Sequence, residues 1–356
     1  MRIETVEILE YFFQNSAYKK TILKRKVEIS HPKTQIIGAP KVGKSSLMHE
    51  YIKSLKKNSF LYIDLNDART SFDPNSLDGF CREKGLEYLI VDNYLYNFKL
   101  PDVKNIIISS DIFVELEGFT PIFLGGLDFE EYISFTKKTT SPEHAFSTYI
   151  KDGVLPEIVS LEDSEKIKRL QEIPKLITSD TQEEDVLRFL LRFLGLEVSI
   201  HQLFTLYKKE ERISKDRFYE IFKRFKSRGI IFGVPIQESG GRTSRLYFYD
   251  YGLKNANMIE KDFLKTFSNL VFLELQSRFT KIEANSYGDF VCEYESLFII
   301  TPFASETILL EKIKKYKDKI TTYKEIKIVS MSLATKLDFA NREIEVVPFW
   351  EWALSE

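Results

Sequence analysis

A phosphate-binding loop is the stretch of this sequence whose residue types and spacing point most directly to chemistry. Residues 38–46 read Gly-Ala-Pro-Lys-Val-Gly-Lys-Ser-Ser and fit the pattern G-x-x-x-x-G-K-[ST] at every fixed position. The glycines let backbone N–H groups curl around phosphate oxygens, and the N-terminus of a following helix adds positive dipole there. We therefore predict an ATP site formed by Gly38, Ala39, Pro40, Lys41, Val42, Gly43, Lys44, Ser45 and Ser46.

Two side chains of this loop have distinct expected roles. Lys44 is expected to reach the β- and γ-phosphates, and the Ser45 hydroxyl to ligate Mg²⁺. Residues 89–92, Leu-Ile-Val-Asp, have the form of a Walker B strand, so Asp92 is expected to hold the water shell of Mg²⁺ opposite Ser45. The alternative interpretation is that Asp92 only ends a strand.

The residues that would hydrolyse ATP are less evident. Asn93 follows Asp92, and its amide can position a water molecule but cannot accept a proton as a base does. Asp64, Asp67 and Asp111 are the nearby acids that could face the γ-phosphate instead. We therefore assign no catalytic residue. ATP and GTP also stay undistinguished, because no base-reading motif such as N-K-x-D is convincing.

The elements around the loop indicate a parallel sheet. Residues 34–37 form an apolar strand that enters the loop, and residues 46–52 are expected to leave it as a helix. Further apolar strands are predicted at 60–65, 88–92, 105–110 and 121–124, and the polar end of 105–110 suits a γ-phosphate sensor. Near-continuous apolar strands with helices between them favour a parallel α/β sheet covered on both faces. We assign residues 1–140, with N-terminal helices, to this P-loop nucleotide-binding domain.

The pattern changes after residue 140. Residues 142–177 predict helices that break at Pro156 and Pro174, and we assign 141–180 to a helical lid or linker. Thr181 resembles an N-cap, and two more helices are predicted near 199–209 and 214–228. Strands at 230–234 and 245–249 follow, joined by a glycine-containing turn. Three helices and a hairpin predict a winged helix over 181–254, and a third α/β unit is predicted over 255–356.

The predicted winged helix is basic although the chain has a net charge of −2. Between His201 and Asp250, five Lys and six Arg outnumber six acids. A basic recognition helix and wing is the electrostatic footprint of DNA binding, but the same surface suits protein contact within an ATPase. Double-stranded DNA and a protein partner therefore both stay open, through the cations Arg217, Lys223, Arg224, Lys226, Arg228, Arg242 and Arg245.

Composition excludes several other classes of protein. The two cysteines, Cys81 and Cys292, form neither a disulfide framework nor a paired-cysteine zinc site. The four histidines show no metal spacing. Residues 297–303, the longest apolar run, are too few to span a bilayer, and the N-terminus lacks the apolar segment of a signal peptide. We expect a soluble, cytoplasmic protein without a membrane partner.

These motifs, in this order, resemble a family of bacterial and archaeal ATPases over nearly the full length of the chain. In that family an AAA-type P-loop domain precedes a winged helix and a C-terminal DUF4143 domain of the PD-(D/E)xK nuclease fold. Residues 127–132 resemble its L-S-F-x-E element, 149–157 its Y-x-x-x-G-G-x-P-E and 247–253 its Y-x-x-D-x-G-L. The resemblance implies an AAA-type fold for the first domain and a small restriction-endonuclease-like α/β fold for residues 255–356.

The chain departs from this family at the positions that carry catalysis. The family has Asp-Glu where this chain has Asp92 and Asn93, and Gly-Arg where this chain has Gly118 and Phe119. The missing arginine is the one that would stabilise transition-state charge. We therefore expect a Mg-ATP-dependent switch with weak or no hydrolysis. The alternative is an active DNA-associated ATPase whose base and arginine come from other residues or a neighbouring subunit.

The C-terminal domain departs in the same way. Ser268 stands where the family has a Glu before Asn269, and residues 297–302 lack the E-x-K strand. Only Asp289 fits a nuclease ligand, and one carboxylate cannot assemble a metal-dependent nuclease. We therefore expect a folded platform without nuclease activity.

Overall fold

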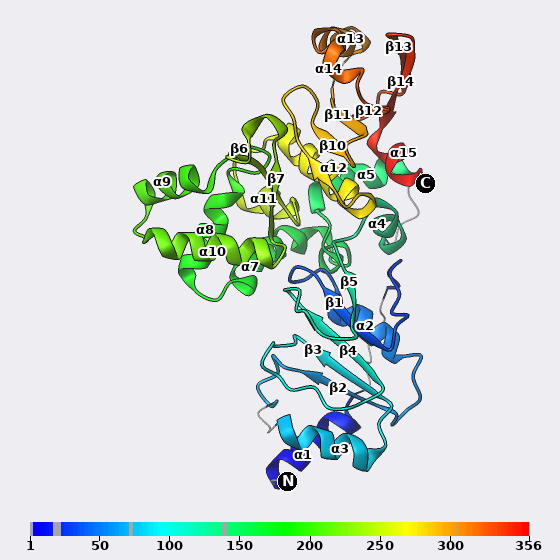
Figure 1. Ribbon diagram of the computed structural model, residues 1–356, viewed down its shortest axis with the longest axis vertical. Helices are drawn as coiled ribbons and strands as arrows, with labels where there is room; N and C mark the ends of the chain where they lie inside the picture. Colours follow the sequence, from blue (N-terminus) through cyan, green and yellow to red (C-terminus); the bar gives the residue numbers. More distant parts are fainter. Residues whose placement is uncertain (1–2, 17–22, 71–73, 137–140, 304, 356) are drawn as a thin grey trace. The chain divides into compact units, whose positions relative to one another are not determined.

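The computed structural model describes residues 3–16, 23–70, 74–136, 141–303 and 305–355 (Figure 1). The chain divides into two compact units. Unit 1 is Met1–Gly125 with Ser227–Gly229, and unit 2 is Gly126–Lys226 with Ile230–Glu356. The predicted boundaries at 140, 180 and 254 stay predictions.

The sheet of unit 1 is entirely parallel, in the order β2-β3-β4-β1-β5. The carboxyl ends of all five strands therefore meet at one edge, which confirms the predicted parallel α/β sheet. The loop after β1 and the last residues of β3 and β4 lie at this edge. The strands are β1 (Lys33–Ile37), β2 (Phe60–Asp64), β3 (Tyr88–Asp92), β4 (Asn105–Ser110) and β5 (Thr120–Phe123).

Helices α1 (Ile3–Gln14) and α3 (Pro74–Lys84) pack side by side over one face of this sheet (Figure 1). Leu9 and Phe80 from these helices meet Ile63 and Val91 from the strands in one buried apolar cluster. Helix α2 (Lys44–Ile52) begins inside the phosphate loop, slightly earlier than predicted. The packed sheet and helices provide a fixed support for that loop.

The centre of unit 2 is a buried aromatic cluster. Phe129, Phe146, Tyr149 and Phe349 come from the three helices α4, α5 and α15, and the ring centroids of the pairs in contact lie 5.1–6.4 Å apart. The helices of this region are α4 (Phe129–Phe135), α5 (Pro142–Asp152), α6 (Pro156–Val159), α7 (Asp163–Ile177), α11 (Gly252–Asn257), α12 (Phe263–Arg278) and α15 (Phe349–Leu354).

Two details of the predicted helices are wrong. Pro174 does not break a helix but lies inside α7, where it is buried with Ile173. Pro174 stands in the last turn of α7, and because proline has no N–H, one backbone hydrogen bond of the helix is lost there. The carbonyl oxygen of Pro174 accepts from the Thr178 hydroxyl at 2.8 Å. The N-cap of α8 is Asp180 rather than Thr181, since its carboxylate accepts from the backbone N–H of Glu183 at 2.8 Å.

Three further helices and a hairpin lie where the sequence predicts them. They are α8 (Thr181–Leu191), α9 (Ile200–Glu210) and α10 (Lys215–Ser227), then β7 (Ile231–Pro235) and β8 (Ser244–Phe248), which pair antiparallel. The short strand β6 (Glu197–Val198) adds to β8 and completes a three-stranded sheet.

The C-terminal part of unit 2 is a mixed sheet in the order β13-β14-β12-β11-β10-β9. Leu297, Ile313 and Ile328 lie in its buried core. Among the described residues, no helix has the length and apolar character needed to cross a membrane. The elements are β9 (Ile282–Glu283), β10 (Phe290–Cys292), β11 (Ser296–Ile300), α13 (Glu306–Lys315), α14 (Lys317–Ile320), β12 (Glu325–Ser330), β13 (Thr335–Phe339) and β14 (Arg342–Pro348).

A buried carboxyl group joins two segments of unit 2 that are distant in sequence. Asp250 is fully buried, and its Oδ1 accepts from the backbone N–H of Val154 at 3.0 Å and of Gly252 at 3.1 Å. The Tyr251 hydroxyl donates to the Tyr149 carbonyl at 2.9 Å. The segments 149–157 and 247–253, singled out by their sequence, therefore form a structural contact.

We expect the stability of unit 2 to fall as the pH rises from about 4 to 7. Burial raises the pKa of Asp250 to about 7, against the two backbone donors that lower it, and burial likewise raises the pKa of Glu274 to about 7. Because the unfolded carboxyls ionise near pH 4, the folded state binds more protons in this window. Above pH 7 the effect levels off.

The measurement is urea unfolding at several pH values, followed by tryptophan fluorescence, since both Trp350 and Trp352 belong to unit 2. Asp250→Asn keeps an acceptor for the two N–H groups but cannot ionise. It should reduce the slope of the free energy of unfolding by up to about 1.4 kcal/mol per pH unit. An unchanged slope would contradict this assignment.

Candidate nucleotide-binding site

The phosphate loop has a backbone that depends on its glycines. Gly43 caps α2 with φ 101°, in the left-handed region. A Cβ atom at Gly38 would lie 2.2 Å from the carbonyl oxygen of Leu124, so no side chain fits there. The Gly38 N–H donates to the Ser110 carbonyl at 3.3 Å, and the loop is thereby anchored to β4. The predicted loop is present as a narrow glycine cradle at the carboxyl edge of the sheet.

The Lys44 side chain folds back over this cradle and is only 6% exposed. Its ammonium donates to the carbonyl oxygens of Gly38 at 2.8 Å and Ala39 at 3.0 Å, and to Asp111 Oδ1 at 2.8 Å. A buried ammonium needs such partners, because an unpaired charge in a protein interior is costly. A phosphate bound in the loop would offer Lys44 stronger anionic partners.

Asp111, directly after β4, is the acid that the structure brings to Lys44. Its Oδ2 also accepts from Arg228 at 2.7 Å, and Ser227–Gly229 group with unit 1. Burial would raise the pKa of Asp111, but Lys44 and Arg228 together hold it below its usual range. Sequence reasoning named Asp111 as a candidate but gave Arg228 only a surface role on the basic helix.

Asp92 ends β3 and is 1% exposed. Its Oδ2 accepts from the Tyr62 hydroxyl at 2.8 Å, and its Oδ1 from the Ser109 hydroxyl and the Asn93 N–H. The Tyr62 ring packs 4.4 Å from His49 of α2. Burial lowers the pKa of His49, although Asp92 and Asp64 oppose that shift. Asp92 is thus a buried carboxylate held by three hydrogen bonds, and its role toward Mg²⁺ stays a prediction.

The Asn93 side chain is bound to the end of the neighbouring strand β2. Asn93 has φ 55°, and its side-chain amide donates to Asp64 Oδ1 at 2.8 Å at the end of β2. Asp67 is paired with Arg69. Of the three nearby acids, Asp111 therefore contacts Lys44, whereas Asp64 contacts Asn93 and Asp67 contacts Arg69.

The residues present suit Mg²⁺ held jointly with phosphates. Mg²⁺ usually takes one or two protein oxygens and completes its shell with phosphate oxygens and water. Ser45, exposed at the start of α2, and Asp92 supply that kind of donor set. Among the described residues, no group of three or more His, Cys, Asp or Glu side chains could hold a metal ion alone. The donor chemistry thus fits a cation that arrives with its nucleotide.

Gly118 and Phe119 take no part in this site. Gly118 has φ 76° in a turn, and Phe119 packs against the apolar cluster between the sheet and its helices. Phe119, which stands where the ATPase family has an arginine, therefore contributes to apolar packing.

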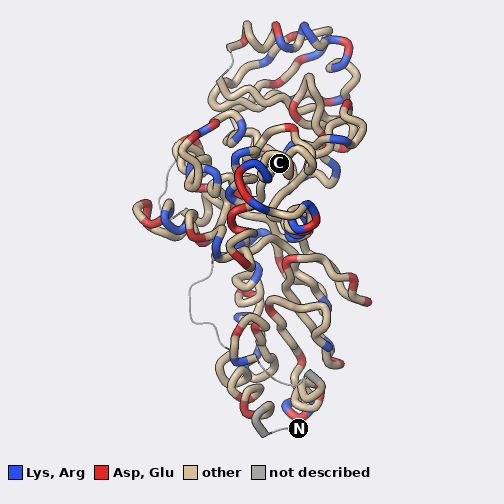
Figure 2. Tube along the Cα trace, turned by 90° about the vertical axis from the view of Figure 1, so that its left-hand side faces the viewer, with Lys and Arg blue, Asp and Glu red and all other residues tan. Residues whose placement is uncertain are grey.

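Much of the predicted basic face is engaged within the protein. Arg217 pairs with Asp180 at 2.7 Å, and Arg224 pairs with the buried Glu183. Arg245 donates to the backbone carbonyls of Asp289 and Asn285 at 3.0 and 2.8 Å. Figure 2 shows Lys and Arg interspersed with Asp and Glu along the trace. The exposed cations of the predicted set are Lys223, Lys226 and Arg242.

The remaining nuclease-like positions have structural contacts. Asp289 Oδ2 accepts from the Ile300 N–H at 2.7 Å, and Lys312 lies 3.7 Å from it. The Ser268 hydroxyl lies 2.9 Å from the Tyr247 hydroxyl. The Asn269 amide exchanges two hydrogen bonds with the backbone of Phe248. Ser268 and Asn269 thus hold α12 against β8, and Asp289 is bound to the end of β11.

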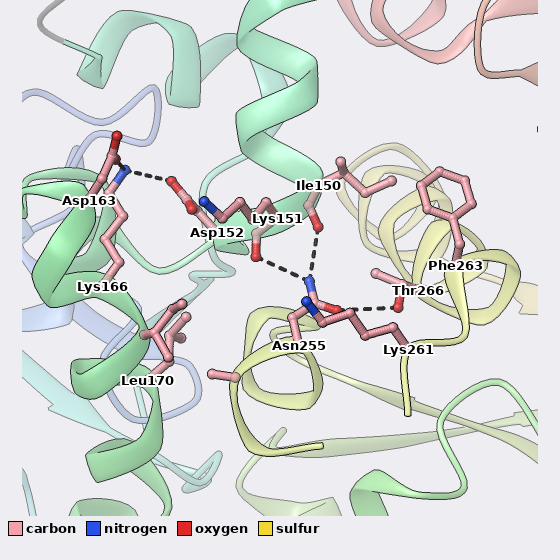
Figure 3. Close-up of a pocket in the computed structure, with 12 residues that line it drawn as sticks. Ile150, Lys151, Asp152, Asp163, Lys166, Leu170, Asn255, Lys261, Phe263 and Thr266 are labelled. Atoms are coloured by element: carbon pink, nitrogen blue, oxygen red, sulfur yellow. Dashed lines mark hydrogen bonds and ion pairs between the residues drawn. The ribbon is translucent and has the colours of Figure 1, made fainter. Parts of the chain in front are cut away.

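Unit 2 also contains a pocket of about 230 Å³ (Figure 3). Figure 3 shows Lys166 directed at Asp152 and Asp163, with which it pairs at 2.6 and 2.9 Å. Burial would lower the pKa of Lys166, but the two carboxylates raise it. Asn255 donates to the carbonyls of Ile150 and Lys151. Lys166, Asp152, Asp163 and Asn255 thus have polar partners within the lining of the pocket.

Comparisons with known proteins add little to this geometry. No protein-family model matches the chain. It is 26% identical to the uncharacterized protein MJ1544 of Methanocaldococcus jannaschii, over 95% of this chain and 92% of that protein. A solved structure, the Walker-type ATPase PABY2304 of Pyrococcus abyssi, aligns with a TM-score of 0.41 and 14% identity, covering 72% of this chain and 95% of that one. Similarity at these levels carries no functional argument.

Proposed function

We propose that this protein binds Mg-ATP at residues 38–46 and uses it as a switch, with slow or no hydrolysis. The observation that supports the proposal best is Lys44, buried over a glycine cradle and held by loop carbonyls and one carboxylate. Bound phosphates would replace these partners and accept from the N–H groups of the loop and of the first turn of α2.

Slow hydrolysis follows from the groups around that position. The Asn93 amide, which donates to Asp64, is not a base, and the Phe119 ring, which packs against the apolar cluster, carries no charge to stabilise a transition state. Asp111 is bound to two cations, and its lowered pKa makes it a weak proton acceptor. ATP would therefore stay bound without being hydrolysed. While ATP is bound, its phosphates would replace the loop carbonyls and Asp111 as the partners of Lys44.

A working ATPase is the second candidate, and Arg228 favours it. Asp111 would orient the attacking water, and Arg228, now paired with Asp111, would supply the missing arginine. Arginine in that role is worth roughly a thousandfold or more in turnover. The two candidates thus differ widely in the rate of phosphate release.

Asp111→Asn should separate the two candidates. Under the switch proposal, ATP affinity rises about tenfold because the anion that competes for Lys44 is gone, while turnover stays slow. Under the second candidate, turnover falls about a hundredfold or more. Calorimetry and phosphate release on one preparation measure both, and Asp67→Asn, which disrupts the acid–arginine pair with Arg69, is the matched control.

The resemblance of the sequence to the ATPase family also suggests the fold of each part of the chain. We infer that the fold of unit 1 is of the AAA type, that α8–α10 with β7 and β8 form a winged helix, and that the C-terminal sheet is a PD-(D/E)xK-like platform without nuclease activity. DNA contact would depend on the exposed Lys223, Lys226 and Arg242, whereas a protein partner could use any part of that face. The cytoplasm, where ATP is available, is the compartment we propose.

The direct test is titration of the purified chain with ATP in the presence and absence of Mg²⁺, followed by single-turnover phosphate release. Micromolar Mg-ATP binding with turnover far below the ~10 s⁻¹ median of enzymes would support the switch. Turnover near that median would overturn it in favour of the second candidate.

A further inference from the structure

Two exposed aromatic rings lie together in unit 1. Phe113 is 52% exposed and Phe123 is 69% exposed. Their ring centroids are 6.4 Å apart, and the ring planes are inclined by only 31°. Single exposed apolar residues are common on protein surfaces. Two neighbouring exposed aromatic rings, by contrast, offer a surface on which a planar base can stack.

The strand register places this pair beside the phosphate loop. Phe123, the last residue of β5, is paired with Ile37, the residue that precedes the loop. Ser110, at the end of β4, is paired with Ile37 from the other side, and Phe113 follows it closely in sequence. The carbonyl oxygen of Leu124, the next residue, lies so close to Gly38 that a Cβ atom there would be 2.2 Å from it. The two rings therefore belong to the segments that flank the entrance of the loop.

The segment that carries Phe113 is fixed rather than loose. The Ser110 hydroxyl donates to the Ile112 carbonyl at 2.8 Å, and the buried Gln35 contacts the Ser110 hydroxyl at 2.9 Å. Asp111 in the same turn is held by Lys44. One short segment thus presents a carboxylate to the loop lysine and an aromatic ring to solvent.

We propose that Phe113 and Phe123 form the subsite that stacks the base of the bound nucleotide, an inference that rests on nucleotide binding at residues 38–46. Base–aromatic stacking tolerates any base, because every base has a π-face. The same subsite would thus accept adenine and guanine alike. The loop would provide affinity for the phosphates, and the aromatic pair would provide affinity for the nucleoside.

The test compares three ligands with Mg²⁺: ATP, GTP and inorganic tripolyphosphate, which has no base. Phe123→Ala and Phe113→Ala should each weaken ATP and GTP about tenfold and leave tripolyphosphate unchanged. Phe123→Tyr should retain the wild-type affinities, because it keeps the ring. Tyr96→Ala is the matched control, since Tyr96 is 79% exposed in the same unit and lies after β3.

The outcomes separate the two ideas. Unchanged ATP affinity in both alanine variants, or an equal loss for tripolyphosphate, would overturn the stacking subsite while nucleotide binding stands. Failure of the wild-type chain to bind any of the three ligands would overturn nucleotide binding itself, and the subsite with it. A selective loss of the two nucleotides supports both.

Discussion

Lys44→Ala should weaken Mg-ATP binding by about a hundredfold or more, the largest effect on binding that we expect from one substitution. The ammonium is the charged group that closes over the glycine cradle, and it is held there by two carbonyls and Asp111. Its removal takes away charge-assisted hydrogen bonds to phosphate and leaves Asp111 as a repelling anion. Isothermal titration calorimetry measures the loss.

Two controls show whether the loss comes from the lysine itself. Lys53→Ala removes a cation beyond the end of α2, where Lys53 pairs with Glu50, and should bind ATP as the wild type does. Lys44→Ala combined with Asp111→Asn removes the repelling carboxylate and should recover only part of the affinity. Equal affinity of wild type and Lys44→Ala would show that this loop is not the site.

The sequence predicts the phosphate loop well because its chemistry is local. The left-handed Gly43 and the start of α2 at Lys44 follow from adjacent residues on a strand, a turn and a helix. The parallel sheet was also predictable, because buried strands with apolar runs need helices on both faces.

The partners of the site were not predictable, because they come from distant parts of the chain. Nothing in the sequence near Asp111 indicates that Arg228 would reach it. The sequence shows that Asn93 carries an amide in place of a base, but not that this amide, on a left-handed backbone, donates to Asp64. A charge pattern likewise indicates a basic face without showing that Glu183, buried in α8, would neutralise Arg224.

The contact between segments 149–157 and 247–253 shows a different limit. Their sequences resemble two separate family elements, and the structure shows that the two segments contact each other through Asp250. Gly153 ends α5 with φ 86° and ψ −165°, which strongly favours glycine. A Cβ atom there would lie 2.0 Å from Asp250 Oδ1 and 3.0 Å from the Cα of Gly252. The absence of a side chain is therefore what allows Asp250 to bind the Val154 N–H.

Gly153→Ala should accordingly destabilise unit 2 by roughly 3 kcal/mol, from backbone strain and the clash together. Urea unfolding monitored by Trp350 and Trp352 measures it. Gly240→Ala is the matched control, because Gly240 has φ 60° with nothing within 4 Å of its Cβ position, and it should cost only about 1 kcal/mol.

The clash with the carboxylate can be tested apart from the backbone strain. In an Asp250→Ala background the clashing group is absent, so Gly153→Ala should cost at least about 1 kcal/mol less there than in the wild type. That coupling would place the two residues in one interlocked contact, since strain of the backbone alone would persist in both backgrounds. Identical costs would mean that the glycine is required only for its φ and ψ angles, and that Asp250 stabilises unit 2 independently of it.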